Sequence, residues 1–333
     1  ATRIEGSLFS NGIVYIVNPA GIFLDGNAVV EVGGLVAAAG SISNEDFLAG
    51  VDRFDLGGDV VNAGQIQAAN VALLGEHVAN HGRIQAPEGT IALVAGDKIL
   101  LTQIGGRILV EVDGPPEGAD SGIVQTGTVD AGEGHAVFAV GDHYSLAINH
   151  EGLTRARAIE LDGGDGLVKV AGTLDATSDD VGGSVHVLGD RVGLFDATVD
   201  ASGDAGGGEI RIGGDRRGEG DLPTSSRTVV DALSVLRADA RKTGDGGSVV
   251  VWSDEATVMA GRLSARGGIH GGDGGFAEIS SLGLLRSEGV VDLGAPNGAR
   301  GTLLYDPQDI VILGGTADGS DDPDASATEL VGD

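Results

Sequence analysis

Short runs of alternating apolar and polar residues recur along the chain. One run has five residues: a small residue, any residue, an aliphatic residue, a polar residue and, in most copies, alanine. Copies of this first phrase lie at residues 64–68, 82–86, 127–131, 172–176, 197–201, 261–265 and, in degraded form, 289–293. Alternation with a period of two is typical of a β-strand that buries one face, so each copy predicts a short half-buried strand.

A second phrase follows the first after a glycine-rich turn. It begins with glycine, alternates in the same way, and in most copies ends at aspartate. Its copies lie at residues 89–97, 183–190, 208–215 and 247–254, with looser copies at 275–279 and 301–305. Gly, Asp or Asn interrupts both phrases at their ends, which predicts tight turns between the strands.

The spacing between copies indicates a solenoid. Asn62 and Asn80 stand at the same position before two copies of the first phrase and are 18 residues apart, and Gly183 and Gly208 start two copies of the second phrase 25 residues apart. One coil of a β-solenoid fits these intervals, whereas a propeller blade needs about 40 residues and four strands. We therefore predict an all-β fold, a parallel β-helix (β-solenoid) rod. About 14 coils would give a rod on the order of 70 Å long.

The composition suits this fold. Glycine accounts for 60 of the 333 residues and aromatic residues for only 3%, yet 41% of the chain is hydrophobic. Ala, Val, Ile and Leu fit a narrow solenoid interior, and glycine adopts the positive φ of tight corners without steric cost. The hydrophobic content argues against disorder, and glycines without a three-residue period argue against collagen.

The charge balance narrows the range of partners. Fifty Asp and Glu against 20 Lys and Arg give a net charge of -30. Because nucleic acids are polyanions, we expect no nucleic-acid partner. No apolar run approaches the roughly 20 residues of a membrane helix, so we expect no membrane span. The chain has no Cys, which excludes disulfides and thiolate metal sites.

The sequence predicts no cofactor and no defined metal site, although acidic turns could bind Ca²⁺. Residues 271–279 resemble the calcium-binding nonapeptide of β-rolls, but Phe276 stands where that motif needs aspartate, and the phrase is not repeated in tandem. The histidines lack the spacing of a zinc site, and we expect most of them at the surface. Four of them are His77, His81, His143 and His150.

Carboxylate pairs raise the alternative of a glycoside-cleaving enzyme, which needs two carboxyl groups about 5 to 9.5 Å apart. The candidate residues are Asp175, Asp179, Asp180, Asp200 and Glu278. A chain with 50 acidic residues brings such pairs together by chance, and no distinctive His, Arg or Lys accompanies them. We therefore predict no catalytic residue. Trp252 and Tyr305 could bind sugar if exposed, but we expect both to be buried.

The first fifty residues are similar to a secretion domain. Segments 10–26, 32–37 and 43–50 resemble the filamentous-haemagglutinin-type secretion domain of two-partner-secretion exoproteins. Segments further along resemble the passenger that follows this domain in large adhesins. These segments are 188–196, 212–215, 264–268 together with 271–275, and 301–307.

The Asn-Pro-Asn-Gly-Ile motif of that family maps onto Asn18, Pro19, Gly21 and Ile22, with Ala20 in place of the second Asn. The resemblance implies a right-handed β-helix and recognition by a dedicated outer-membrane β-barrel transporter. It also implies a secreted or cell-surface location in a Gram-negative-type bacterium. Because the family carries a capping region and an earlier Asn-Pro motif before the point where Ala1 stands, we expect this chain to be part of a longer protein.

This interpretation divides the chain into three parts. Residues 1–57 are expected to be part of a haemagglutinin-type secretion domain, residues 58–312 to continue the β-helix, and residues 313–333 to form an acidic linker or tail. The predicted function is that of a non-enzymatic, extracellular structural or adhesive protein. End-to-end self-association into a surface filament, a monomeric adhesin fragment, and a β-helical carbohydrate-active enzyme remain alternatives. A host or cell-surface glycan or protein is a further candidate partner.

Overall fold

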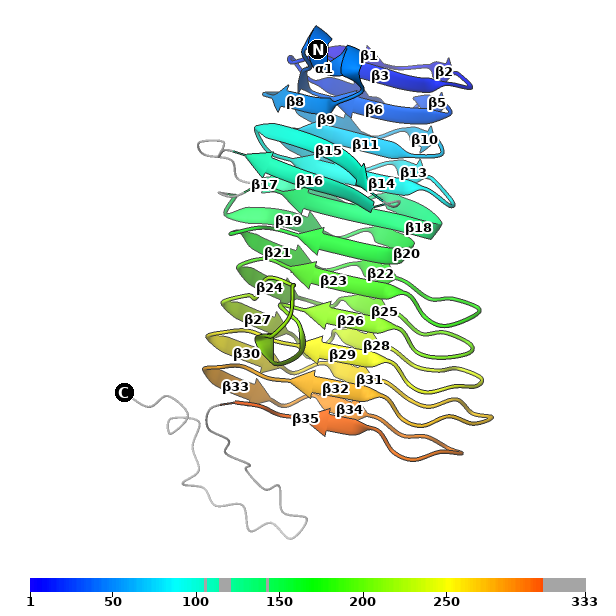
Figure 1. Ribbon diagram of the computed structural model, residues 1–333, viewed down its shortest axis with the longest axis vertical. Helices are drawn as coiled ribbons and strands as arrows, with labels where there is room; N and C mark the ends of the chain where they lie inside the picture. The colour runs from blue at the N-terminus through cyan, green and yellow to red at the C-terminus, as the bar shows by residue number, and fades with distance from the viewer. Residues whose placement is uncertain (105–106, 114–120, 142–143, 308–333) are drawn as a thin grey trace.

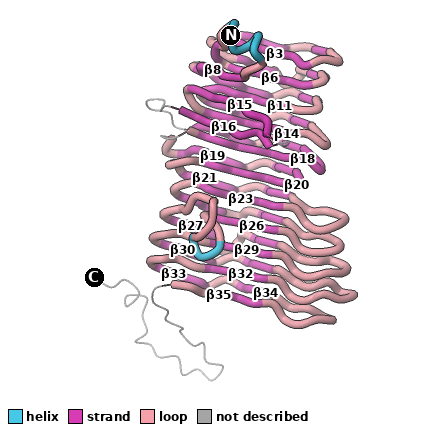
Figure 2. Tube along the Cα trace, in the orientation of Figure 1, coloured by secondary structure: helices cyan, strands magenta, loops and turns pink. Residues whose placement is uncertain are grey.

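The computed structural model describes residues 1–104, 107–113, 121–141 and 144–307. Three parallel ladders of short strands run along the molecule and enclose one core (Figure 1). Figure 2 shows that strands and loops make up nearly all of the rod, with two short helical segments, α1 (Asn44–Ala49) and η1 (Arg216–Gly218). The predicted parallel β-helix is therefore confirmed.

The first ladder is a sheet of 11 strands. These strands are β1 (Thr2–Ile4), β4 (Ile22–Leu24), β9 (Asp59–Asn62), β12 (His77–Asn80), β17 (Ser121–Gln125), β19 (Leu146–His150), β21 (Leu167–Val170), β24 (Arg191–Leu194), β27 (Arg227–Val230), β30 (Ala256–Met259) and β33 (Leu284–Ser287). With a rise of about 4.8 Å per coil, 11 coils make a rod of roughly 50 Å. The described residues form fewer coils than the expected 14 because several segments leave the helix, including β15 and β16 (described below) and the loop around η1.

The first phrase forms the second ladder. Its short strands are β2 (Ser7–Phe9), β5 (Val29–Glu31), β10 (Gln65–Gln67), β13 (Arg83–Gln85), β22 (Thr173–Asp175), β25 (Thr198–Asp200), β28 (Val235–Arg237), β31 (Arg262–Ser264) and β34 (Val290–Asp292). In each described copy of the phrase the central aliphatic residue faces the core. A period of two thus places that residue correctly in every coil.

The second phrase forms the third ladder. Its strands are β3 (Ile13–Val17), β6 (Gly34–Ala38), β11 (Val71–Gly75), β14 (Thr90–Ala95), β23 (Ser184–Leu188), β26 (Glu209–Ile212), β29 (Ser248–Val251), β32 (Phe276–Ile279) and β35 (Thr302–Leu304). Two longer strands, β18 (Thr128–Val140) and β20 (Leu153–Asp162), run through both ladders and merge them into one 20-stranded sheet.

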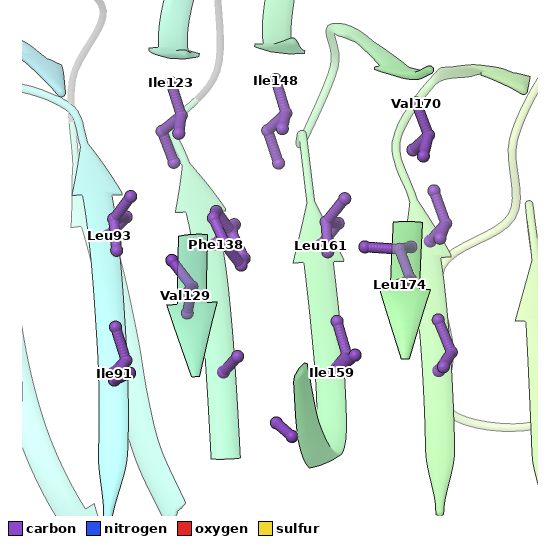
Figure 3. Close-up of a cluster of buried hydrophobic side chains, with 14 of the residues drawn as sticks. Ile91, Leu93, Ile123, Val129, Phe138, Ile148, Ile159, Leu161, Val170 and Leu174 are labelled. Atoms are coloured by element: carbon purple, nitrogen blue, oxygen red, sulfur yellow. The ribbon is translucent and has the colours of Figure 1, made fainter. Parts of the chain in front are cut away.

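Side chains at equivalent positions of successive coils stack inside the rod (Figure 3). Leu93, Phe138 and Leu161 are register partners on β14, β18 and β20, and all three are fully buried. Figure 3 shows them in a row that faces Val129 and Ile148 from the other two ladders. The core is therefore a stack of thin layers, and in each layer residues from the three ladders pack against one another.

A row of buried polar side chains runs from coil to coil at the ends of four successive first-ladder strands. The Asn62 Nδ2 donates to Asn80 Oδ1 at 2.8 Å, and the Asn80 Nδ2 donates to Gln125 Oε1 at 2.8 Å. His150 takes the next position in register and is fully buried. Its Nε2 lies 2.8 Å from Thr154 Oγ1, while its Nδ1 has no hydrogen-bond partner.

An additional antiparallel sheet packs against the outside of the rod. Its strands, in spatial order, are β16 (Arg107–Asp113), β15 (Lys98–Ile104), β8 (Asp52–Leu56) and β7 (Gly40–Ser41). Phe54 and Ile99 from this sheet pack on outward-facing side chains of β11 and β14, among them Leu74 and Val94. The alternation expected for residues 89–97 is therefore wrong: β14 is buried on both faces because a second layer covers it.

The ladders continue without interruption past residue 57, from β4 to β9 and from β6 to β11. The expected tail, residues 313–333, lies outside the described residues. No described helix has the length and apolar character needed to cross a membrane.

Candidate secretion motif and its surroundings

The four predicted motif residues form a turn between β3 and β4. The Gly21 backbone N–H donates to the Asn18 carbonyl at 3.0 Å, which closes a four-residue turn with Pro19 at its second position. Proline favours that position because its φ is already fixed near −65°. The Asn18 side chain accepts a further bond from the Ala20 N–H at 2.9 Å. The motif residues therefore form a tight turn.

Asn18 also ties this turn to two other strands, β1 and β6. Its Nδ2 donates to Thr2 Oγ1 on β1 at 3.0 Å, and its backbone N–H donates to the Ala38 carbonyl on β6 at 3.0 Å. The Thr2 N–H in turn donates to the Gly21 carbonyl at 2.8 Å. The motif therefore organises the first coil rather than presenting a reactive group.

Gly21 and Ile22 fix the start of β4. Gly21 has a φ of 98°, and a Cβ there would lie 3.1 Å from the Asp59 carbonyl and 3.0 Å from the Phe23 ring. Ile22 is fully buried and pairs in register with Thr2. Only glycine combines this φ with this close approach.

Pro19 and Ala20 are the exposed part of the motif. Ala20 occupies the position that is Asn in the resembling family, and its backbone N–H is held by Asn18. The turn keeps its shape because Asn18 makes the bonds that define it, so the Ala20 substitution changes the outward side chain and leaves the backbone path intact.

An apolar surface lies beside the motif and was missed at the level of sequence. Ile13 on β3 is 69% exposed, and Phe47 and Leu48 on α1 are 50% and 84% exposed. The Tyr15 ring meets the Phe47 ring edge to face, with centroids 5.4 Å apart. The signal for this surface was the run Ile13–Val17, which is apolar at every position and thus lacks the alternation of a half-exposed strand.

The carboxylates considered for catalysis do not form one site. Asp175 and Asp200 are register partners on β22 and β25, in the second ladder, whereas Glu278 lies on β32, in the third. Asp179 and Asp180 are exposed in the loop between β22 and β23. The described candidates are thus spread over different sides of the rod.

Asp175 has a structural role. Its carboxylate accepts from Arg155 Nε at 2.9 Å and from Thr177 Oγ1 at 2.6 Å. Desolvation raises the pKa of this carboxyl group, but the hydrogen bonds from Thr177 and Arg155 outweigh it and leave the pKa below its ordinary value. Asp175 is therefore an ionised partner in a cross-coil bond.

The described residues provide no set of side chains that could bind a metal ion. In that part of the chain no three His, Asp or Glu side chains converge on one point. His77 Nδ1 lies 2.6 Å from the Ser121 carbonyl, His81 is exposed, and His143 lies outside the described residues. His150, by contrast, is buried, so the expectation of surface histidines is wrong for this residue. Calcium at the acidic turns stays a prediction.

The two aromatic residues on strand phrases differ. Trp252 is 1% exposed, as expected, although it packs outside the core, beneath the loop that follows β26. Tyr305 is 36% exposed, so the expectation of burial is wrong for it. Its hydroxyl lies 3.3 Å from Ser287 Oγ.

The geometry of the first coils agrees with comparisons to known proteins. A family model described as the TPS secretion domain matches residues 1–187, more than half of the chain. The chain belongs to the TPS secretion domain family. Domains of this two-partner-secretion family are not enzymes; they engage an outer-membrane transporter, and their exoproteins are secreted from Gram-negative bacteria.

A solved TPS domain has a similar fold. The crystal structure of the HMW1 secretion domain from Haemophilus influenzae is similar with a TM-score of 0.70 and 26% sequence identity, and the match covers 87% of this chain and 80% of that one. The heme/hemopexin-binding protein of Haemophilus influenzae is 30% identical over 40% of this chain. That alignment spans 16% of the relative's length. The TPS match extends through the predicted boundary at residue 57 to residue 187.

Proposed function

We propose that this chain is the secretion-directing and rod-forming part of a non-enzymatic exoprotein, recognised by an outer-membrane β-barrel transporter. The observation that carries this proposal is the TPS secretion domain match over residues 1–187. The motif turn at Asn18 and the adjacent apolar surface of β3 and α1 support a recognition role for the first coils. A TPS transporter is therefore the first partner we assign.

The chain is suited to passage through a narrow barrel. It contains no Cys, so no disulfide can lock a folded intermediate before transport. Each coil pairs with its neighbours through backbone bonds, so a rod can grow coil by coil after the chain emerges. Outside the cell the same ladders would resist extension, which fits a structural or adhesive role.

Replacing Asn18 with alanine is expected to lower secretion through the cognate transporter about tenfold. The substitution removes two side-chain hydrogen bonds that hold the recognition turn, and about 1.4 kcal/mol of lost interaction corresponds to a factor of ten. The measurement is the amount of chain in the medium when the exoprotein and transporter are co-expressed. Asn27→Ala, at an exposed Asn in the next turn, is the matched control.

The same experiment separates recognition from folding. Thermal unfolding of the purified Asn18→Ala chain should show that the rod still forms, because the turn lies at one end of it. Secretion equal to that of wild type and of Asn27→Ala would contradict the role assigned to this motif. If Asn18→Ala fails to fold, binding to the transporter should be measured by pull-down with the unfolded chain.

End-to-end association is a second candidate function, favoured by the ends of the described rod. Strands β1, β2 and β3 pair only with the following coil, and β33, β34 and β35 only with the preceding one, within the described residues. Edge strands of this kind pair with further coils of the same protein or, by β-augmentation, with a second copy. A second copy is the partner proposed here; a host or cell-surface glycan or protein remains a proposed partner of the adhesive rod.

Filament formation should appear as a concentration-dependent rise in particle length. Negative-stain microscopy and sedimentation velocity over a hundredfold concentration range, with and without Ca²⁺, would measure it. Fibres with a regular axial repeat are expected if the ends stack. Short single rods at every concentration would reject self-assembly and leave the monomeric adhesin fragment.

A further inference from the structure

One loop of the rod reaches across coils that follow it in the sequence. Residues 213–224, here called the strap, leave the third ladder after β26 and carry η1 before the chain returns to the first ladder at β27 (Figures 1 and 2). The strap touches Trp252, which follows β29, then β32 of the next coil, and Asp306 beyond β35. It therefore bridges coils that are up to 89 residues apart in the chain.

Trp252 lies directly beneath the strap. A Cβ on Gly214 would lie 2.8 Å from the Trp252 ring, and one on Gly218 would lie 2.5 Å from it, so the strap backbone rests on the indole. The Trp252 Nε1 donates to Asp254 Oδ1 at 3.1 Å, and Thr224 Oγ1 donates to the other oxygen of Asp254 at 2.7 Å. Asp254 thus fixes the Thr224 end of the strap, and each of its carboxylate oxygens accepts a hydrogen bond.

The far end of the strap rests on Glu278. The Arg217 N–H donates to Glu278 Oε1 at 2.9 Å, and Arg217 holds a φ of 60°, which is unusual for a residue with a side chain. The Arg217 guanidinium is 3.9 Å from Asp306, and the Arg216 guanidinium lies 4.1 Å from the centre of the Phe276 ring. One carboxylate therefore anchors the strap tip through a backbone bond.

Glu278 is an unusual anchor because it is fully buried and its Oε2 has no hydrogen-bond partner. Its neighbours in register, Val250 and Leu304, are apolar. The charged groups around it are Arg216 and Arg217 from the strap and Asp306 from the segment after β35.

The other polar groups near Glu278 do not satisfy its second oxygen. Ser280 Oγ accepts from the Asp306 N–H at 3.0 Å, and Arg211, two coils away in the same row, is engaged by Glu209 and Asp215. Desolvation raises the pKa of Glu278 above its ordinary value despite the bond from Arg217 and the nearby guanidinium charge. The closed strap therefore favours a neutral carboxyl group.

We propose that the strap is a pH-sensitive clasp over Trp252, closed while Glu278 carries a proton and loosened when Glu278 ionises. An ionised Glu278 leaves a charged oxygen in a dry site without a donor, and opening of the strap lets water reach it. The open form exposes the Trp252 indole and frees the ring of Phe276 from Arg216. The clasp thereby couples the stability of four successive coils to one proton.

The direction of the pH effect follows from linkage. Because the pKa of Glu278 is higher when the strap is closed than when it is open, proton binding favours closure. Closure is strongest below the ordinary glutamate pKa and weakens as the pH rises through the raised value. At still higher pH closure stays less favourable than at acid pH by a constant amount.

The chain carries its own reporter for this motion. Trp252 is the one Trp in the sequence, so acrylamide quenching of its fluorescence measures access to the indole alone. In the wild-type protein the quenching constant should rise about threefold from pH 4.5 to pH 8, within the range where far-UV circular dichroism is unchanged. Glu278→Gln, which stays neutral, should show a low quenching constant at every pH.

A matched variant controls for general charge effects. Glu160 stands in the same row of the third ladder as Glu278 but is exposed, so Glu160→Gln should titrate like wild type. A wild-type quenching constant that is flat with pH would overturn the clasp, and so would equal pH dependence in Glu278→Gln. The wild-type titration decides the question even if Glu278→Gln fails to fold. At pH 8, trypsin cleavage after Arg216 or Arg217 should also be faster in wild type than in Glu278→Gln.

Discussion

Gly208→Val is expected to lower the free energy of unfolding by more than about 3 kcal/mol. Gly208 stands at the start of β26, where a Cβ would lie 2.6 Å from the Gly182 carbonyl carbon and 2.8 Å from the Ala201 oxygen. The obstructing atoms are backbone, so no rotamer change can relieve the clash. The coil cannot shift either, because the Gly208 and Glu209 N–H groups bond Ala201 and Gly183 at 2.8 and 2.9 Å.

The same obstruction recurs in later coils, which explains why glycine begins the second phrase there. Gly247 and Gly275 occupy the equivalent positions on later coils. A Cβ on either would clash with the backbone carbonyl of the equivalent glycine one coil earlier. At these positions glycine is needed for close stacking of the coils, without any requirement for positive φ. The effect should therefore be similar at Gly247.

Urea unfolding followed by circular dichroism measures this effect. Gly57→Val is the matched control, because a Cβ at Gly57 would meet no atom within 4 Å. We expect Gly57→Val to unfold near the wild-type midpoint and Gly208→Val well below it. Equal midpoints for the two variants would show that the coils can separate to admit a side chain.

Acidification from pH 6.5 to pH 4 should destabilise the rod through His150, by up to about 3 kcal/mol. Desolvation of the fully buried ring lowers the pKa of His150 to about 4. The folded state therefore resists protonation, while the unfolded chain takes up a proton below about pH 6.5. Stability from this residue is present above pH 6.5 and is lost as the pH falls toward 4.

His150→Gln isolates this contribution from that of the acidic residues. Glutamine already occupies the same row one coil earlier, at Gln125, so the position accepts an amide. The free energy of unfolding of wild type and variant should be compared at pH 7 and pH 4.5. We expect the wild type to lose more stability than His150→Gln; a parallel loss in both would mean that His150 is solvated before it is protonated.

The repeated pattern was enough to predict the architecture. Alternation in copies such as 183–190 and 197–201 specifies short strands with one buried face, and the intervals between copies specify a coil. These signals are local, because each strand uses the same period and each corner uses the same small residues. The turn at the motif is local as well, since Asn18, Pro19 and Gly21 form it from bonds within four residues.

The sequence was less informative about layers outside the rod. Leu74 and Val94 follow the pattern of their neighbours, and nothing near them in the chain says that Phe54 and Ile99 will cover their outer face. The expected number of coils failed for the same reason: residues that leave the helix cannot be distinguished from coil residues by period alone.

The chain by itself determined the β-helix and its small-residue core, and it marked the positions of the repeated glycines and of the motif at Asn18. Only the tertiary structure decided that His150 is buried, that Glu278 anchors a strap from 61 residues earlier, and that Asp175 and Glu278 lie on different sides. The physical reason is that a solenoid sets contacts by coil register. Loops and insertions of different length accumulate between coils, so partners across coils follow from the folded stack and not from sequence spacing.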